Sequence, residues 1–271
     1  MSLRRWVMIY VMAKVYAISN QKGGVGKTTT CLCLGDALTE LRRRVLLVDL
    51  DPQAGLTTIL GFASQPFNNS IHEVLLGHAS LSEAILKTKN EKLDLVPSKI
   101  DLAGAEALLL GIEGWQSVLQ KALEKEEHHY DYILLDCPPS LGVLTIIALV
   151  AADRVIIPVQ AEFLALVGLK HLHKLIEYIK ASFNSGLEAK ILRTMVDTRT
   201  LHNREIVEEL EKVFGERVYR AIIGKTIKFP DASYARESIL KFASDSKAAQ
   251  AYRELAKEVI ADDKEEGGEG A

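Results

Sequence analysis

The chain has 271 residues, of which 48% are hydrophobic and 25% charged, so it is long enough for one large domain and unlike a fibrous or disordered protein. Its formal net charge of −3 does not by itself favour nucleic-acid binding, so the distribution of charge along the chain has to decide that question. Cys31, Cys33 and Cys137 are too few and too irregularly spaced for a disulfide framework or a tetrahedral metal site, which fits a reducing cytoplasm.

Residues 1–12 are interpreted as an N-terminal extension that precedes the folded domain. Two arginines and the apolar run 6–12 resemble parts of a signal peptide. However, the run is short, and no small-residue cleavage site separates it from the strand predicted at Val15. No later run reaches the roughly eighteen uninterrupted apolar residues of a membrane span, so we expect a cytoplasmic protein without a membrane anchor.

The most informative stretch is 21–29, which reads Gln-Lys-Gly-Gly-Val-Gly-Lys-Thr-Thr. A strand-like segment, 15–19, precedes it and a helix-like segment, 27–41, follows it, which is the context of a nucleotide-phosphate loop. Glycines allow several backbone N–H groups to point at one anion, and the helix N-terminus adds partial positive charge. We therefore predict that Lys27 neutralises the β- and γ-phosphates of ATP and that Thr28 offers its hydroxyl to Mg²⁺. The predicted cofactor-binding residues are Gly23, Gly24, Val25, Gly26, Lys27, Thr28 and Thr29.

This loop departs from the common pattern G-x-x-x-x-G-K-[ST], because Gln21 stands where the first glycine is expected and a second lysine, Lys22, lies inside the loop. The pattern K-G-G-x-G-K-[ST] resembles that of the deviant Walker A ATPases of the ParA/MinD group, and the chain is most similar to ParA-type, Soj-like partition ATPases. In such proteins the matching lysine acts on the nucleotide of a second subunit, as an arginine finger does. The resemblance therefore implies an ATP-dependent homodimer in which Lys22 takes part in catalysis.

The next predicted strand, 45–49, is a continuous apolar run that leads into Asp49-Leu50-Asp51. Such runs are typical of parallel strands buried on both faces, and carboxylates at their C-terminal ends lie at the edge where ligands bind in open α/β sheets. Asp51 is therefore predicted to face the phosphates. The segment V-D-L-D-P-Q is similar to the ParA-type switch I, which implies that Asp51 polarises the attacking water. The alternative is a turn-forming role for Asp51 before Pro52, with Asp49 as a strand-end cap.

A second run of the same kind, 132–136, ends in Asp136 and is followed by Cys-Pro-Pro at 137–139. This is the Walker B arrangement, in which Asp136 holds Mg²⁺ through water. The segment D-C-P-P resembles the switch II of the family. One phosphate loop together with two carboxylate-ended strands is a specific combination, and it predicts a Mg²⁺-dependent ATPase.

Strands and helices alternate along the rest of the chain at a spacing that predicts a doubly wound, mainly parallel sheet with helices on both faces. We expect one domain, 13–260, with the P-loop NTPase fold that the resemblance implies. The acidic, glycine-rich segment 261–271 is predicted to be a disordered tail. Further strands are predicted at 93–98, 154–159 and 190–196, and helices at 70–76, 80–86, 115–127, 164–183, 203–214 and 247–260.

The C-terminal part of the chain is mildly basic. Residues 190–241 include eleven Lys/Arg and eight Asp/Glu, a local excess of three positive charges in an acidic protein. The resemblance to Soj-like proteins implies that Arg199, Lys225 and Lys228 contact DNA phosphates, although the family's segment P-R-x-x-x-[LF] is only partly kept at 224–229. A solvated surface of mixed charge is the alternative, because phosphate binding needs clustered cations.

The resemblance extends from Lys14 to about Ile260. It implies a cytoplasmic, nucleoid-associated DNA-partition ATPase with Lys22, Lys27 and Asp51 as catalytic residues. Such an ATPase dimerises on ATP, binds DNA without sequence preference, and hydrolyses ATP when a ParB-type centromere-binding protein stimulates it. ATP is expected rather than GTP, because the sequence contains no N-K-x-D segment.

Three other functions compete with the partition ATPase. A MinD-like cell-division positioning ATPase ends in a basic amphipathic membrane helix, whereas the end of this chain is acidic. A reductase like the nitrogenase iron protein needs cluster-binding cysteines, and the three cysteines here do not match that pattern. A nucleotide-binding module without turnover is the fourth function, and in it Asp51 has no catalytic task.

Overall fold

The structure is a computed structural model, and it describes residues 12–160, 165–197, 199 and 201–268. The described residues form an eight-stranded sheet with the strand order β3-β4-β2-β5-β1-β6-β7-β8. Neighbouring strands are parallel except β3 and β4, which pair antiparallel. The strands are β1 (Lys14–Ile18), β2 (Val45–Asp49), β3 (Leu86–Lys87), β4 (Leu93–Val96), β5 (Tyr132–Asp136), β6 (Arg154–Gln160), β7 (Glu188–Val196) and β8 (Val218–Gly224).

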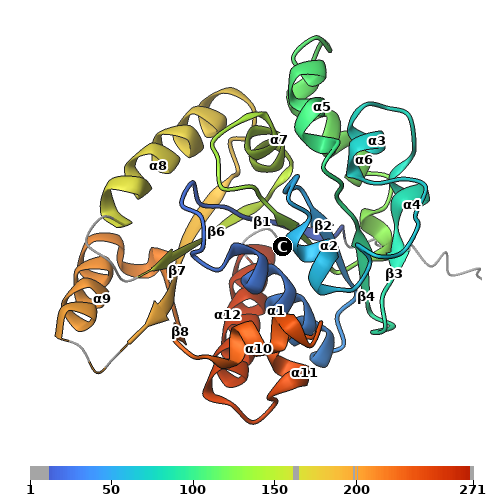
Figure 1. Ribbon diagram of the computed structural model, residues 1–271. Coiled ribbons are helices and arrows are strands. Elements are labelled where there is room, and N and C mark those ends of the chain that lie inside the picture. Colours follow the sequence, from blue (N-terminus) through green and yellow to red (C-terminus); the bar gives the residue numbers. More distant parts are fainter. Residues whose placement is uncertain (1–11, 161–164, 198, 200, 269–271) are drawn as a thin grey trace, which may run out of the picture.

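Helices cover both faces of this sheet, which confirms the predicted doubly wound, mainly parallel fold (Figure 1). α1, α10, α11 and α12 lie on one face, and α5, α6, α7 and α8 lie on the other. The helices are α1 (Lys27–Glu40), α2 (Gly55–Ile59), α3 (Ile71–Leu75), α4 (Leu81–Ala84), α5 (Leu102–Leu109), α6 (Val118–Leu123), α7 (Val143–Ala151), α8 (Ala165–Ser182), α9 (Leu201–Phe214), α10 (Lys228–Tyr234), α11 (Ile239–Phe242) and α12 (Lys247–Gly268). Short 3₁₀ turns lie at Trp115–Ser117, Glu127–His129 and Gly215–Arg217.

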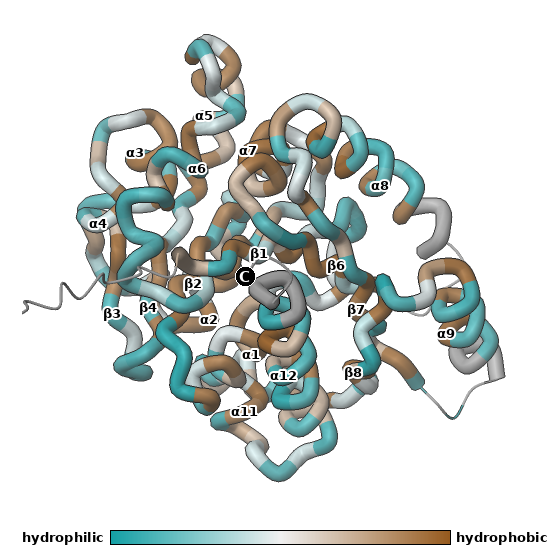
Figure 2. Tube along the Cα trace, turned by 180° about the vertical axis from the view of Figure 1, so that it is seen from behind, coloured by the Kyte–Doolittle hydropathy of each residue, from teal (hydrophilic) through white to brown (hydrophobic). Residues whose placement is uncertain are grey.

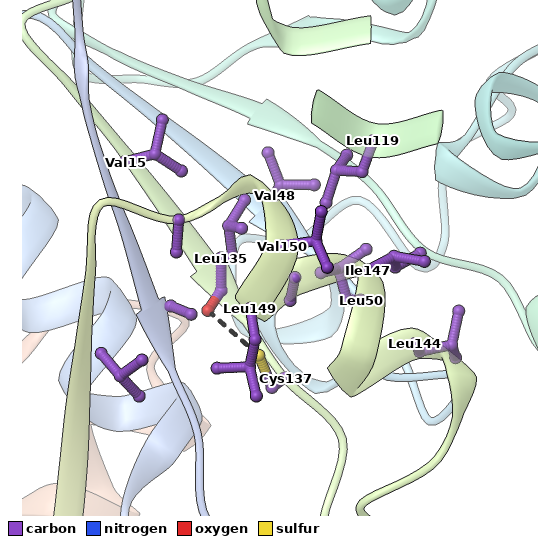
Figure 3. Close-up of a cluster of buried hydrophobic side chains, with 14 of the residues drawn as sticks. Val15, Val48, Leu50, Leu119, Leu135, Cys137, Leu144, Ile147, Leu149 and Val150 are labelled. Carbon is purple, nitrogen blue, oxygen red and sulfur yellow. Dashed lines mark hydrogen bonds between the residues drawn. The ribbon is translucent and has the colours of Figure 1, made fainter. Parts of the chain in front are cut away.

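Each face of the sheet has its own apolar core. On one face, side chains of the central strands lie among apolar residues of α7, as Val48 and Leu135 do beside Ile147 and Val150 (Figure 3). On the other face, α1 and α12 pack on the same strands through buried leucines and Tyr252. β2 and β5 are buried along their whole length, because each strand contributes side chains to both cores. This is why their sequences are continuous apolar runs. α8 and α9 alternate between hydrophilic and hydrophobic stretches, as expected for helices with one covered face (Figure 2).

The register of the central strands brings their C-terminal ends level with one another. Asp136 at the end of β5 pairs with Ile18 of β1 on one side and with Asp49 of β2 on the other. The C-terminal ends of these parallel strands form one edge of the sheet. At this edge lie the loop after β1, the carboxylate at the end of β5 and the segment after β2. This is the edge where the sequence placed the nucleotide.

The end of the chain corrects one expectation. The closing helix α12 continues to Gly268, so a disordered tail from residue 261 is wrong for 261–268, and 269–271 lie outside the described residues. The acidic residues of this segment reach the opposite edge of the sheet from the nucleotide-binding edge, because Asp262 pairs with Arg154 (3.3 Å) and Lys190 (2.7 Å). Asp263 accepts hydrogen bonds from two tyrosine hydroxyls, those of Tyr16 (2.8 Å) and Tyr132 (2.9 Å). Composition alone indicated disorder, but these partners hold the segment as helix.

The predicted N-terminal extension, 1–12, lies almost wholly outside the described residues. The sequence also missed β8, which forms one edge of the sheet, and the two-residue strand β3, which forms the other edge.

We predict that Asp263→Ala lowers the free energy of unfolding by about 1–3 kcal/mol, because it leaves two largely buried tyrosine hydroxyls without their acceptor. Chemical denaturation of wild type and variant measures the difference. Lys264→Ala is the matched control, since it changes the neighbouring, exposed position of the same helix. Equal stability of the Asp263→Ala and Lys264→Ala proteins would show that the hydrogen bonds of Asp263 to β1 and β5 add nothing to the free energy of unfolding.

Candidate functional site

The loop between β1 and α1 owes its shape to two glycines. Gly24 and Gly26 have φ values of 74° and 94°, in the left-handed region that residues with a Cβ rarely adopt. Gly26 also stands directly before α1, where the first backbone N–H groups of a helix have no partner within the helix. The loop therefore turns sharply into the helix and leaves these donors available to an anion.

Side-chain hydrogen bonds hold this loop against two neighbouring strands. The Asn20 amide donates to the carbonyl of Pro158 in β6 (2.8 Å), and its oxygen accepts from the backbone N–H of Lys22 (3.0 Å). The Thr194 hydroxyl of β7 donates to the carbonyl of Val25 (2.8 Å), which is buried. These bonds fix the two ends of the loop to β6 and β7.

The two lysines of the loop are in opposite environments. Lys27 is only 7% exposed, and its ammonium donates to the carbonyl of Lys22 (3.1 Å). Burial lowers the pKa of Lys27, while the negative charges of Asp136 and Asp51 act in the opposite direction. Lys22 itself is exposed, together with Gly23 and Gly24. A buried cation and an exposed cation therefore come from one loop.

Asp136 is fully buried at the end of β5. Among the described residues, neither of its carboxylate oxygens accepts a hydrogen bond of normal geometry. Burial, followed by the charge of Asp49, raises the pKa of Asp136 well above its usual range, and the Thr28 hydroxyl acts to lower it. A buried acceptor with unused lone pairs, next to a hydroxyl, fits a hydrated Mg²⁺ that also binds phosphate oxygens. In the described part of the chain no group of three or more His, Cys, Asp or Glu could form a separate cation cage.

The segment after β2 is held beside the loop by Asp49. This buried carboxylate accepts hydrogen bonds from the backbone N–H (2.8 Å) and the hydroxyl (2.7 Å) of Thr57 in α2. Desolvation raises the pKa of Asp49 to about 6 in spite of these bonds. At the start of α2, a Cβ added to Gly55 would lie 3.7 Å from the Thr28 methyl group, so α2 begins against the phosphate loop. Asp49 therefore does more than cap a strand end, because it fixes α2 in place.

Asp51 lies at the same edge of the sheet. It is half-buried, accepts a hydrogen bond from the backbone N–H of Gln53 (2.9 Å), and is near enough for its charge to favour the charged form of Lys27. The structure thus brings Lys27, Thr28, Asp51 and Asp136 together. Thr29 is half-buried in the first turn of α1.

The three residues predicted to contact DNA form a second group. Arg199, Lys225 and Lys228 line one open hollow of about 640 Å³ beside the ends of β7 and β8. Lys247, the first residue of α12, lines the same hollow and was missed in the sequence because it is distant along the chain. The fold therefore gathers cations that are scattered in the sequence.

The chain is similar to several known proteins along most of its length. A family model described as an AAA domain matches residues 13–189. The sporulation initiation inhibitor protein Soj of Bacillus subtilis is 41% identical over 251 residues, which cover 92% of this chain and 99% of that protein. The chromosome partitioning protein ParA of Caulobacter vibrioides is 41% identical over 251 residues, which cover 91% of this chain and 94% of that protein.

A solved structure is equally similar in sequence. The cobyrinic acid a,c-diamide synthase of Mycobacterium smegmatis with bound ADP and magnesium has a TM-score of 0.81 and 42% identity, and the match covers 92% of this chain and 94% of that one. The same protein has also been solved with a bound ATP analogue and magnesium, at a TM-score of 0.81 and 41% identity.

We predict that Asp51 and Asp136 have separable tasks at the nucleotide edge. ATP binding by the wild type should weaken when Mg²⁺ is removed, whereas binding by Asp136→Asn should change little, because its Mg²⁺ ligand is already lost. Asp51→Ala should keep the Mg²⁺-dependent binding of the wild type but hydrolyse ATP about 10²–10⁴-fold more slowly.

Calorimetric titration of ATP with and without Mg²⁺, followed by single-turnover hydrolysis, measures both effects. Equal Mg²⁺ dependence in Asp136→Asn and wild type contradicts the metal assignment. Wild-type single-turnover hydrolysis by Asp51→Ala contradicts the assignment of water activation to that residue.

Proposed function

This chain belongs to the ParA/Soj-type ATPases, and we propose on that basis that it is a DNA-partition ATPase. In this proposal it uses ATP and Mg²⁺, forms a nucleotide-sandwich dimer, and binds DNA without sequence preference in the ATP state, which places it on the nucleoid. A ParB-type centromere-binding protein then stimulates hydrolysis and releases the dimer. The convergence of Lys27, Thr28, Asp51 and Asp136 at one sheet edge is the observation that carries the proposal.

The nucleotide site supports hydrolysis rather than storage of ATP. Lys27 and the N-terminus of α1 face the place of the β- and γ-phosphates, and Asp136 and Thr28 are the protein groups that hold the metal. Bound Mg²⁺ supplies charge that neutralises the phosphate oxygens. Asp49 at this edge is already bonded to Thr57, so Asp51 is the carboxylate left to orient and polarise the attacking water.

The environments of the two lysines support the dimer. Lys27 is buried, and its ammonium bonds to the backbone of the loop at Lys22. A second cation from the same loop is therefore redundant for neutralising the phosphates of the same subunit. Lys22 is exposed at the surface of that loop, where a second copy of the chain brings its own nucleotide. We assign Lys22 to the phosphates of the facing subunit, which makes ATP occupancy and dimerisation depend on each other.

The gathering of four cations supports DNA binding through phosphates. Arg199, Lys225, Lys228 and Lys247 line one hollow, and clustered cations are what backbone contact with DNA requires. Contacts to phosphates carry no sequence preference, because every DNA sequence presents the same backbone.

A MinD-like membrane ATPase is the less favoured alternative. None of the helices in the described part of the chain is both long enough and apolar enough to span a bilayer. α12 carries Asp262, which pairs with both Arg154 and Lys190 of the fold, whereas a surface-bound membrane helix presents basic residues to lipid.

The amide synthase activity in the name of the M. smegmatis protein is a second candidate, because that structure is 42% identical to this chain. Amide synthesis that takes its nitrogen from glutamine through a thiolate needs a reactive cysteine. All three cysteines here are buried, and burial raises the pKa of each. A test for ATP-dependent amidation of cobyrinic acid by the purified protein decides between the two, and turnover would contradict the partition assignment.

We predict that Lys22→Ala binds ATP as a monomer but loses ATP-dependent dimerisation, DNA binding and hydrolysis together. Lys27→Ala, by contrast, should lose ATP binding itself, because the phosphate charge then meets only backbone dipoles. Sedimentation velocity with ATP separates the two variants. The assignment of Lys22 to the facing subunit is falsified if Lys22→Ala dimerises on ATP as well as wild type does.

We also predict that Lys228→Ala and Arg199→Ala weaken DNA binding equally for all sequences and leave basal ATP hydrolysis unchanged. For Lys228→Ala the slope of log affinity against log salt should fall by about 0.9, because one phosphate contact is lost. Lys92→Ala is the control, since it removes an exposed lysine beside β4, near the other edge of the sheet. Sequence-selective loss, or loss equal to that of Lys92→Ala, would contradict the assignment.

A further inference from the structure

Among the described residues that line the cationic hollow, one carries a carboxylate. It is Asp197, which directly follows β7, and the cations that line the same hollow are Arg199, Lys225, Lys228 and Lys247. An acidic side chain in a surface that binds phosphate is unexpected, because like charges repel and each carboxylate weakens the field that attracts the anion. The position of this carboxylate therefore needs an explanation.

Asp197 occupies the hydrogen-bonding edge of the Arg199 guanidinium. Nε of Arg199 donates to one carboxylate oxygen (2.8 Å) and Nη2 donates to the other (2.7 Å). The backbone N–H of Arg199 adds a third bond to the same carboxylate (3.1 Å). This paired arrangement is the one by which arginine binds a phosphate, so carboxylate and phosphate compete for the same donors.

The carboxylate is charged at every physiological pH. Hydrogen bonds from Arg199 lower the pKa of Asp197 to about 2, and the positive charge of Lys225 acts in the same direction. Asp197 thus interacts with two of the cations in the hollow. Protonation therefore does not break the contact at physiological pH, and an incoming phosphate competes for the same donors.

We propose that Asp197 is an internal competitor of DNA phosphate for Arg199, which keeps binding to DNA weaker and less salt-dependent than the four cations alone would make it. This inference rests on the proposed function, since it concerns the regulation of the same DNA surface. Weak, reversible contact suits a dimer that has to leave DNA after hydrolysis.

The expected effect is moderate, because the side chain of Arg199 is 87% exposed and exposed ion pairs hold their partners weakly. Asp197→Asn should increase affinity for DNA about two- to five-fold at moderate salt. It should also make the slope of log affinity against log salt steeper by up to about 0.9, because Arg199 becomes available for one more phosphate. If Asp197 instead served to orient Arg199 toward phosphate, the same substitution would weaken binding, so the sign of the change separates the two roles.

The test is fluorescence anisotropy with a labelled duplex of arbitrary sequence, in ATP and Mg²⁺, between about 50 and 200 mM salt. Asp231→Asn is the matched control, because it removes the same charge from an exposed position of α10 that does not line the hollow. The double variant Asp197→Asn/Arg199→Ala should bind no more tightly than Arg199→Ala alone. Thermal melting checks that every variant is folded.

Three results would overturn the inference. These are weaker binding by Asp197→Asn, a gain no larger than that of Asp231→Asn, and a gain that persists in the double variant. A wild-type protein that does not bind DNA with ATP overturns the proposed function as well. A wild type that binds, without a specific gain in Asp197→Asn, overturns only the competition at Arg199.

Discussion

The buried ammonium of Lys27 is the constraint on which the rest of the nucleotide site depends. A cation taken out of water is costly unless charges and hydrogen bonds compensate it. Here the ammonium donates a hydrogen bond to the carbonyl of Lys22 (3.1 Å), and Asp136 and Asp51 supply the opposing charge. Three features bring these groups to one point: the turns at the glycines of the loop, the buried end of β5, and the hydrogen bonds of Asp49 that hold α2. A phosphate chain that enters this point meets a cation and a row of backbone donors already in place.

The nucleotide loop and the cationic hollow are joined by the end of one strand. Thr194 of β7 holds the phosphate loop through the carbonyl of Val25, and two residues further along Val196 accepts the backbone hydrogen bond of Lys225. Asp197 and Arg199 follow directly. The phosphate loop and the hollow are therefore both attached to the end of β7.

The sequence was sufficient wherever the structure depends on local pattern. The strands β2 and β5 lie as predicted, with a carboxylate at the end of each, because a continuous apolar run of this length is typical of a strand buried on both faces. The phosphate loop also lies as predicted, because its glycines adopt the left-handed backbone conformation that other residues rarely adopt. β8 was missed because the exposed Arg220 interrupts its apolar residues, so it lacks the continuous apolar run that identified β2 and β5. The helix at 261–268 was missed because its partners, among them Tyr16 and Arg154, come from distant strands. Lys247 likewise joins the hollow only in three dimensions.

In the proposed function, ATP converts this chain into a form that binds DNA through phosphates. The most direct measurement compares the affinity for one arbitrary duplex in ATP, in ADP and without nucleotide, at a fixed salt concentration. We expect tight binding with ATP and Mg²⁺ only, with the affinity falling steeply as salt rises. Equal affinity in all three nucleotide states, or no binding in any of them, would contradict it.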